Sequence, residues 1–155
     1  MNWIIRNTKK LKFHTNLNML LAAEWIDVAN YNWFMSDIEL TFFEQNTLLD
    51  SNQEYFQLSG SEFKLFVESK SQVIWGVISA INKNEEIIFD KNNLPFADGN
   101  GDLWENSKLQ IENSILEIIA WDSSYTILKF RDETLSRRFK ENFDEAIELD
   151  KYKFK

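Results

Sequence analysis

Apolar residues near the N-terminus recur at intervals of three and four. This spacing places Leu17, Leu20, Leu21 and Trp25 on one face of a helix, and Thr15 stands where an N-cap residue is expected. We therefore predict a helix that follows Thr15 and buries this face.

The pattern then changes to a period of two over residues 31–43, which is typical of a β-strand. One face of this strand is predicted to carry Phe34, Ser36, Ile38, Leu40 and Phe42. The other face carries Trp33, Asp37 and Glu39 and is expected to lie toward solvent. A tight turn at Ser36-Asp37, dividing the segment into two strands, is the alternative.

A capped helix and a buried strand are predicted for the middle of the chain. Ser59 and Glu62 have the spacing of a capping box, in which each side chain bonds the backbone amide of the other residue. The buried stripe of this helix is expected to comprise Phe63, Phe66 and Val67. Residues 73–81 are apolar on both faces and rich in β-branched side chains, which indicates a central strand covered on both sides. Residues 86–89 are expected to return as a further strand.

The C-terminal third predicts a hairpin and a helix. Residues 114–121 and 125–130 read as two strands joined by a short connection, and Asp132 then stands at an N-cap position. The helix is expected to bury Leu135, Phe139 and Phe143, and a last edge strand to contain Ile147 and Leu149. The order of these elements indicates a single α+β domain over residues 1–155, with a mostly antiparallel sheet and two to three helices.

Composition supports a folded domain in a reducing compartment. Of the 155 residues, 44% are hydrophobic and 15% aromatic, enough for one sizeable core. The chain has no cysteine, which excludes disulfides, thiolate zinc sites and thiol catalysis. No secretory signal pattern and no apolar run near the ~18 residues of a membrane span is present. We expect a soluble, cytoplasmic protein that does not act at a membrane.

The charge of the chain is unevenly distributed. The net charge is −8, yet residues 1–14 carry four bases and no acid. Residues 13–63 contain no lysine or arginine but eight carboxylates: Glu24, Asp27, Asp37, Glu39, Glu44, Asp50, Glu54 and Glu62. Bulky apolar residues interleave with these acids. Such a field attracts a basic protein surface and repels a phosphate backbone, so nucleic acid is not an expected partner.

Each candidate for catalysis or metal binding has a simpler structural interpretation. His14 is the only histidine, so a multi-histidine metal site cannot form, and we expect a surface or cap role for it instead of catalysis. Asp98, Asn100 and Asp102 have the spacing that opens a calcium loop. That loop requires a glycine and a glutamate at later positions, which are Leu103 and Leu109 here. A surface turn explains the segment better.

Two acidic pairs suggest hydrolytic chemistry only superficially. Asp50 followed by Glu62 and Lys64 resembles the carboxylate-lysine set of metal-dependent nucleases, but Glu62 is already assigned to a capping box. Asp37 and Glu39 are close enough to act as the paired acids of a glycosidase, a spacing that is also common on acidic surfaces. We predict no catalytic residue, no metal ligand and no cofactor, and expect that the protein is not an enzyme.

The segment Ile115–Ile127, with the helix from Asp132, looks like the C-terminal part of small bacterial proteins of uncharacterised function. The whole chain is similar in character to immunity proteins of bacterial toxin systems, which are short, acidic, cysteine-free α+β domains. This resemblance implies a protein that binds and neutralises a basic toxin domain, for example a nuclease.

The residues hypothesised to bind this partner are Asp37, Glu39, Trp33, Glu44, Asp50 and Glu54, with Trp33 as the central anchor. An acidic interaction domain of another kind and a carboxylate- or metal-dependent hydrolase are the alternatives. The oligomeric state has no signature in the sequence.

Overall fold

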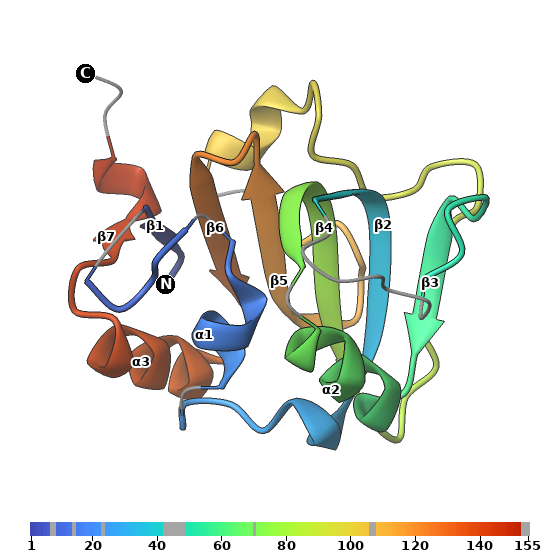
Figure 1. Ribbon diagram of the computed structural model, residues 1–155, viewed down its shortest axis with the longest axis horizontal. Coiled ribbons are helices and arrows are strands. Elements are labelled where there is room, and N and C mark those ends of the chain that lie inside the picture. The colour runs from blue at the N-terminus through green and yellow to red at the C-terminus, as the bar shows by residue number, and fades with distance from the viewer. Residues whose placement is uncertain are drawn as a thin grey trace.

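The computed structural model describes residues 1–6, 9–13, 15–22, 24–41, 49–69, 71–105 and 108–152. The strands of this part are β1 (Trp3–Ile5), β2 (Tyr31–Thr41), β3 (Tyr55–Leu58), β4 (Gln72–Asn82), β5 (Ser114–Trp121), β6 (Tyr125–Phe130) and β7 (Ile147–Glu148). They form one antiparallel sheet in the order β3-β2-β4-β5-β6-β1-β7 (Figure 1). The α-helices are α1 (Leu17–Leu21), α2 (Gly60–Glu68) and α3 (Glu133–Asn142). Short 3-10 helices are η1 (Val28–Asn30), η2 (Gly101–Trp104) and η3 (Leu149–Lys151). The predicted α+β class is confirmed.

Both faces of the sheet are covered, by different parts of the chain. In Figure 1, α1 and α2 lie in front of the sheet and α3 lies toward its β6–β7 end. Helix residues such as Phe63 and Phe139 share one apolar cluster with Ile118 of β5. The next residue of β5, Ile119, belongs to a second cluster with Leu103 of η2, on the opposite face. This alternation explains why the central strands are apolar at consecutive positions.

Three local predictions are confirmed. Ser59 caps α2: its hydroxyl accepts from the Glu62 amide at 3.2 Å, and the Glu62 carboxylate accepts from the Ser59 amide at 2.7 Å. Asp132 caps α3 by accepting from the amides of Thr134 and Leu135. The β5–β6 hairpin forms in the predicted place, and β5 pairs with the buried strand β4.

Other local predictions are wrong. The N-cap of α1 is Asn16, whose side chain accepts from the Met19 amide, while the Thr15 hydroxyl contacts that of Thr126 at 2.9 Å. Residues 86–89 are not a strand; the Asn113 side chain bonds two of their backbone groups, accepting from the Ile88 amide and donating to the Glu86 carbonyl. The predicted last strand is limited to β7, and Leu149 begins η3.

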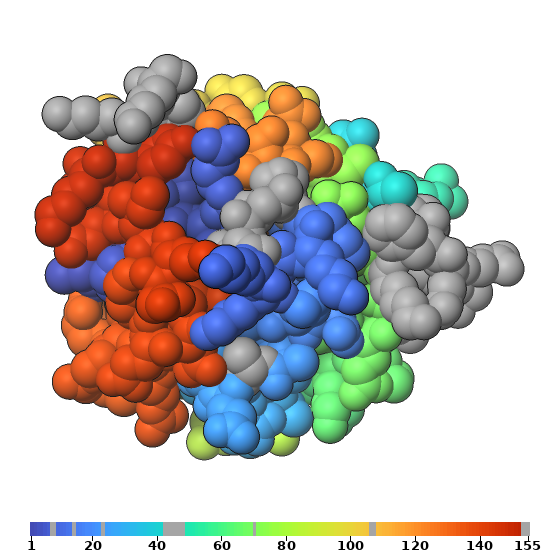
Figure 2. Space-filling model, turned by 60° about the vertical axis from the view of Figure 1, so that its left-hand side comes forward, coloured from blue at the N-terminus to red at the C-terminus, as the bar shows by residue number. Residues whose placement is uncertain are grey.

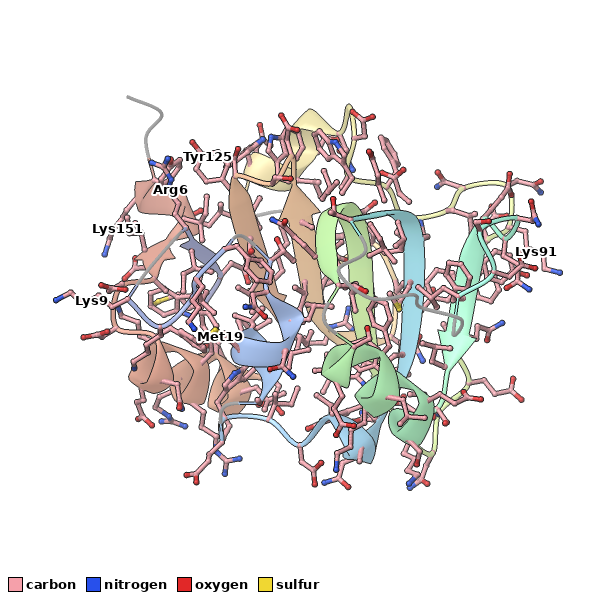
Figure 3. All side chains as sticks on the ribbon, viewed as in Figure 1. Arg6, Lys9, Met19, Lys91, Tyr125 and Lys151 are labelled. Atoms are coloured by element: carbon pink, nitrogen blue, oxygen red, sulfur yellow. The ribbon has the colours of Figure 1, made fainter. Side chains whose placement is uncertain are left out.

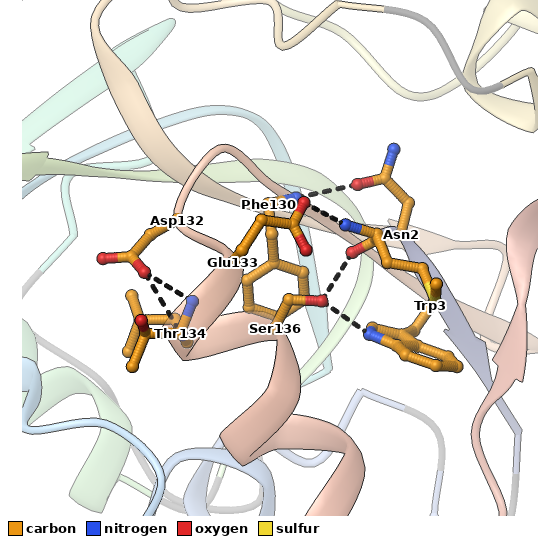
Figure 4. Close-up of polar contacts among 9 residues, drawn as sticks. Asn2, Trp3, Phe130, Asp132, Glu133, Thr134 and Ser136 are labelled. Carbon is orange, nitrogen blue, oxygen red and sulfur yellow. Dashed lines mark hydrogen bonds and ion pairs between the residues drawn. The ribbon is translucent and has the colours of Figure 1, made fainter.

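The strand β1 is too short to show a period in the sequence, and the C-terminal segment holds it in place. The Trp3 indole N–H donates to the Ser136 hydroxyl at 2.9 Å, and that hydroxyl donates to the Met1 carbonyl (Figure 4). The Phe130 amide donates to the Asn2 side chain on the other side of the strand. Figure 2 shows the N-terminal residues (blue) against the segment from α3 onward (red). Residues far apart in sequence therefore form one end of the sheet.

Candidate functional site

An irregularity in β2 determines where its acidic side chains point. Ser36 pairs with Val77 of β4 and Glu39 pairs with Trp75, so Asp37 and Ile38 together lie opposite Gly76. This is a β-bulge, and the backbone of Asp37 has a φ of 54°. A Cβ on Gly76 would lie 2.5 Å from Cδ1 of Ile38, so the glycine leaves the room that this side chain fills.

The bulge exchanges the two faces of the strand. Phe34 packs in the cluster on the side away from the helices, whereas Ile38 packs against the cluster on the helix side. The prediction that Phe34 and Ile38 share a face is therefore wrong. The tight turn at Ser36-Asp37 is also wrong, because β2 runs without interruption from Tyr31 to Thr41.

Three hydrogen bonds from two side chains hold residues 94–98 against the bulge. The Asp37 carboxylate accepts from the amides of Ala97 at 2.8 Å and Asp98 at 3.0 Å through one oxygen, Oδ2. The Ser36 hydroxyl donates to the Pro95 carbonyl at 2.6 Å. Hydrogen bonds to an ionised acceptor are among the stronger ones, so Asp37 holds this segment against β2 while its own carboxylate is fixed in direction.

An open hollow of about 480 Å³ lies between this segment, β2 and the residues that precede β3. Its polar lining includes the carboxylates of Asp37, Glu39, Glu54 and Asp98 and one ammonium group, that of Lys91. Its apolar lining includes Ile38, Trp75, Leu94, Pro95 and Phe96. Phe96 is 43% exposed and Trp75 is half-buried, so both rings are available at the wall. We call this the acidic hollow.

The structure brings together three of the predicted site residues and places Asp50 and Trp33 elsewhere. Asp37, Glu39 and Glu54 all line the acidic hollow. Asp50 does not; its side chain accepts from the Asn52 amide at 3.0 Å in an exposed turn. Glu44 lies outside the described residues.

The prediction that Trp33 is an exposed anchor beside Asp37 is wrong. Trp33 is fully buried on the helix side, where its ring stacks on Phe63 with 3.9 Å between centroids. Its indole N–H donates to the Val28 carbonyl at 2.9 Å. Trp75 is the tryptophan that lines the hollow. Because Trp75 lies inside the apolar run of residues 73–81, the sequence pattern assigned it to the core. The adjacent Gly76, which marks the bulge, was the signal that could have corrected this assignment.

The other acidic candidates have structural contacts of their own. The Asn100 side chain accepts from the Asp102 amide and so caps η2, instead of pointing with Asp98 and Asp102 toward a common centre. Glu62 is committed to its capping box. Within the described ranges, no group of three or more acidic or histidine side chains is placed to hold a metal ion.

Part of the positive charge of the chain lies at the end of the sheet away from the hollow. Figure 3 shows Arg6, Lys9 and Lys151 at the β1–β7 end and Lys91 at the β3 end. The Arg6 guanidinium lies 5.0 Å from the centroid of the Tyr125 ring, within range of a cation–π contact. The basic N-terminal segment thus lies at one end of the sheet and the acidic hollow at the other.

Comparison with known proteins adds no assignment. No protein-family model, no curated protein and no solved structure matches the chain. Among the helices of the described ranges, none has the length and apolar character to cross a bilayer.

Proposed function

We propose that this chain is a non-catalytic, immunity-type protein that binds and neutralises a basic toxin domain through the acidic hollow. The observation that carries the proposal is the meeting of Asp37, Glu39, Glu54 and Asp98 around one open hollow with accessible aromatic walls. A cytoplasmic location is part of the proposal, supported by a sequence without cysteine.

The hollow has the chemistry to receive a lysine or arginine side chain from the partner. Its carboxylates come from separate segments and line one open space, so their charges add to one negative field that attracts a cationic side chain. Asp37 is already fixed by two backbone amides, which reduces the side-chain entropy lost on binding. The rings of Trp75 and Phe96 supply faces for cation–π contact with the same group.

The longer-range effect of these charges is on the rate of association. Clustered charges of one sign steer an oppositely charged partner and raise its association rate, and salt screens this effect. We therefore expect charge reversal at the hollow to act mainly on association, and removal of a wall aromatic to act on dissociation.

The test begins with capture of the partner on the immobilised chain from the native host, followed by binding kinetics at low and high salt. In Glu39→Lys with Glu54→Lys, association should slow by about tenfold or more and lose most of its salt dependence. Asp37 is left unchanged because its carboxylate also fixes the wall of the hollow.

A matched control makes the same change in net charge on the helices. Glu68 in α2 and Glu141 in α3 are both exposed, and their double replacement by lysine should leave association within about twofold of the original chain. The proposal would be contradicted by an acidic partner, or by an association rate that is the same at low and high salt. A basic partner that has no toxic activity for the chain to inhibit would instead favour another kind of acidic interaction domain.

A further inference from the structure

A carboxyl group lies buried in the middle of the sheet, on the face away from the helices. Glu117 of β5 is 0% exposed, and it pairs with Ser79 of β4 on one side and Lys129 of β6 on the other. Both neighbours are also fully buried. These three residues form a polar row across strands that are otherwise apolar, and none of them lines the acidic hollow.

The contacts of Glu117 satisfy only part of its carboxyl group. Oε2 accepts from the Gln110 amide at 2.7 Å. Oε1 and the nearby Ser79 hydroxyl are both buried and have no hydrogen-bond partner among the described residues. An ionised carboxylate in this position would bury a charge with one oxygen unsatisfied, which is costly.

The charged groups around this row come from few elements. Lys129 faces Glu117 from β6, and β4 contributes only the neutral Ser79. Asp102 of η2 and Glu105 act on Lys129 from the covering segment, and Lys108 and Glu112 of that segment are exposed. Burial raises the pKa of Glu117 to about 7, while the backbone amides of Gln110 and Ile111, the Gln110 side chain and the charge of Lys129 act in the opposite direction. Near neutral pH, both protonation states of Glu117 are therefore accessible.

Gln110 connects this buried group with the wall of the acidic hollow. Its backbone amide bonds Glu117, and its side chain bonds both backbone groups of Phe96: Oε1 accepts from the amide at 3.0 Å and Nε2 donates to the carbonyl at 3.3 Å. Phe96 lines the hollow, and the next residue, Ala97, donates to Asp37. An unbroken series of contacts thus joins Glu117 to Asp37.

We propose that Glu117 and Gln110 form a proton-operated latch that seats residues 94–98 against the sheet. When Glu117 is neutral, the segment around Gln110 packs over it and Phe96 is held in place. When Glu117 ionises, its unsatisfied oxygen draws water beneath the segment, Gln110 loosens, and the wall of the hollow is released. The latch goes beyond the proposed function and does not depend on it, because it is tested without a partner.

The test follows the backbone amides of Phe96 and Ala97 by NMR in the full chain, from about pH 5.5 to 8.5, and records both chemical shifts and hydrogen exchange. We expect an inflection near pH 7. The ionised fraction of such a group rises about tenfold between pH 6 and pH 8. Between pH 6 and pH 8, the exchange rate at these amides should therefore increase by a factor about ten times larger in the original chain than in Glu117→Gln, which cannot ionise.

Two further variants keep the test decisive. His14→Gln removes the only histidine, the side chain that ordinarily titrates in this range, and should leave the inflection intact. Gln110→Ala removes the side-chain bonds to Phe96. The chemical shift of the Glu117 carboxyl carbon should then still follow the titration of this group, while the Phe96 and Ala97 amides no longer respond to it. An inflection that is absent from the original chain, that survives Glu117→Gln, or that persists in Gln110→Ala would overturn the latch.

Discussion

Replacing Glu117 by glutamine should change how the stability of the protein depends on pH. The glutamine keeps an oxygen to accept from the Gln110 amide, so the best contact of the residue is preserved. It removes the titration, because an amide has no proton to gain or lose near neutral pH. Any difference in pH dependence between the two chains therefore reports the pKa of Glu117 in the folded protein.

The sign and size of the difference follow from linkage. Burial raises the pKa of Glu117 from 4.5 to about 7, so between these values the folded state binds more protons than the unfolded state. Its contribution to stability is fully present below pH 4.5 and is lost as the pH rises through about 7. Between pH 5 and pH 8 the loss amounts to about 2.5 kcal/mol. Burial lowers the pKa of Lys129, so this residue makes the free energy of unfolding rise with pH between its lowered pKa and the ordinary value of 10.5.

Urea unfolding at a series of pH values measures this directly. The free energy of unfolding of the original chain, minus that of Glu117→Gln, should fall by about 2.5 kcal/mol from pH 5 to pH 8. Titrating groups on which the charge of Glu117 does not act cancel in the subtraction. Lys129 is the exception, because the charge of Glu117 raises its pKa and the glutamine does not. Two parallel curves would refute the argument that burial dominates the pKa of Glu117, and would remove the basis of the latch as well.

The remaining predictions concern the core and are checked by thermal or urea unfolding. Gly60→Ala should destabilise by about 1–3 kcal/mol, because a Cβ there would lie 2.2 Å from the carbonyl oxygen of Ala29. Gly101→Ala is its control and should change stability by less than about 0.5 kcal/mol, since nothing lies within 4 Å of the added atom. Trp33→Ala should cost about 3–5 kcal/mol, and an unchanged melting temperature would contradict its burial. Ile78→Asp should unfold the domain, because it places an unpaired carboxylate in the centre of the sheet.

The features that were correctly predicted depend on short stretches of sequence. The capping box of α2 needs only Ser59 and Glu62, three positions apart. The strand at residues 73–81 is recognisable because a sheet covered on both faces selects apolar side chains at consecutive positions. In both cases the physical cause lies within one turn or one strand, so the sequence contains the whole signal.

The acidic hollow could be predicted only in part, because its shape depends on contacts between distant residues. The alternation of β2 correctly grouped Asp37 with Glu39, and the missing bases of residues 13–63 indicated an acidic surface. The bulge depends on the room that Gly76 leaves in the neighbouring strand, and without it Trp33 was assigned to the wrong face. Residues 94–98, which complete the hollow, have no periodic pattern, and contacts with Ser36 and Asp37 hold them there.

The polar row beneath the latch had a signal in the sequence that was not used. Glu117 and Lys129 are the charged residues within two strands that the sequence already joined into a hairpin. Trp121 pairs with Tyr125 across the turn, and four equal steps along each strand lead to Glu117 opposite Lys129. Opposite charges at facing positions indicate a cross-strand pair, which on an exposed face would be an ordinary stabilising contact. Here the segment that contains Gln110 and η2 lies over the pair and buries it, and burial is what raises the pKa of Glu117. This segment has the least regular pattern in the chain, so the sequence did not predict its position.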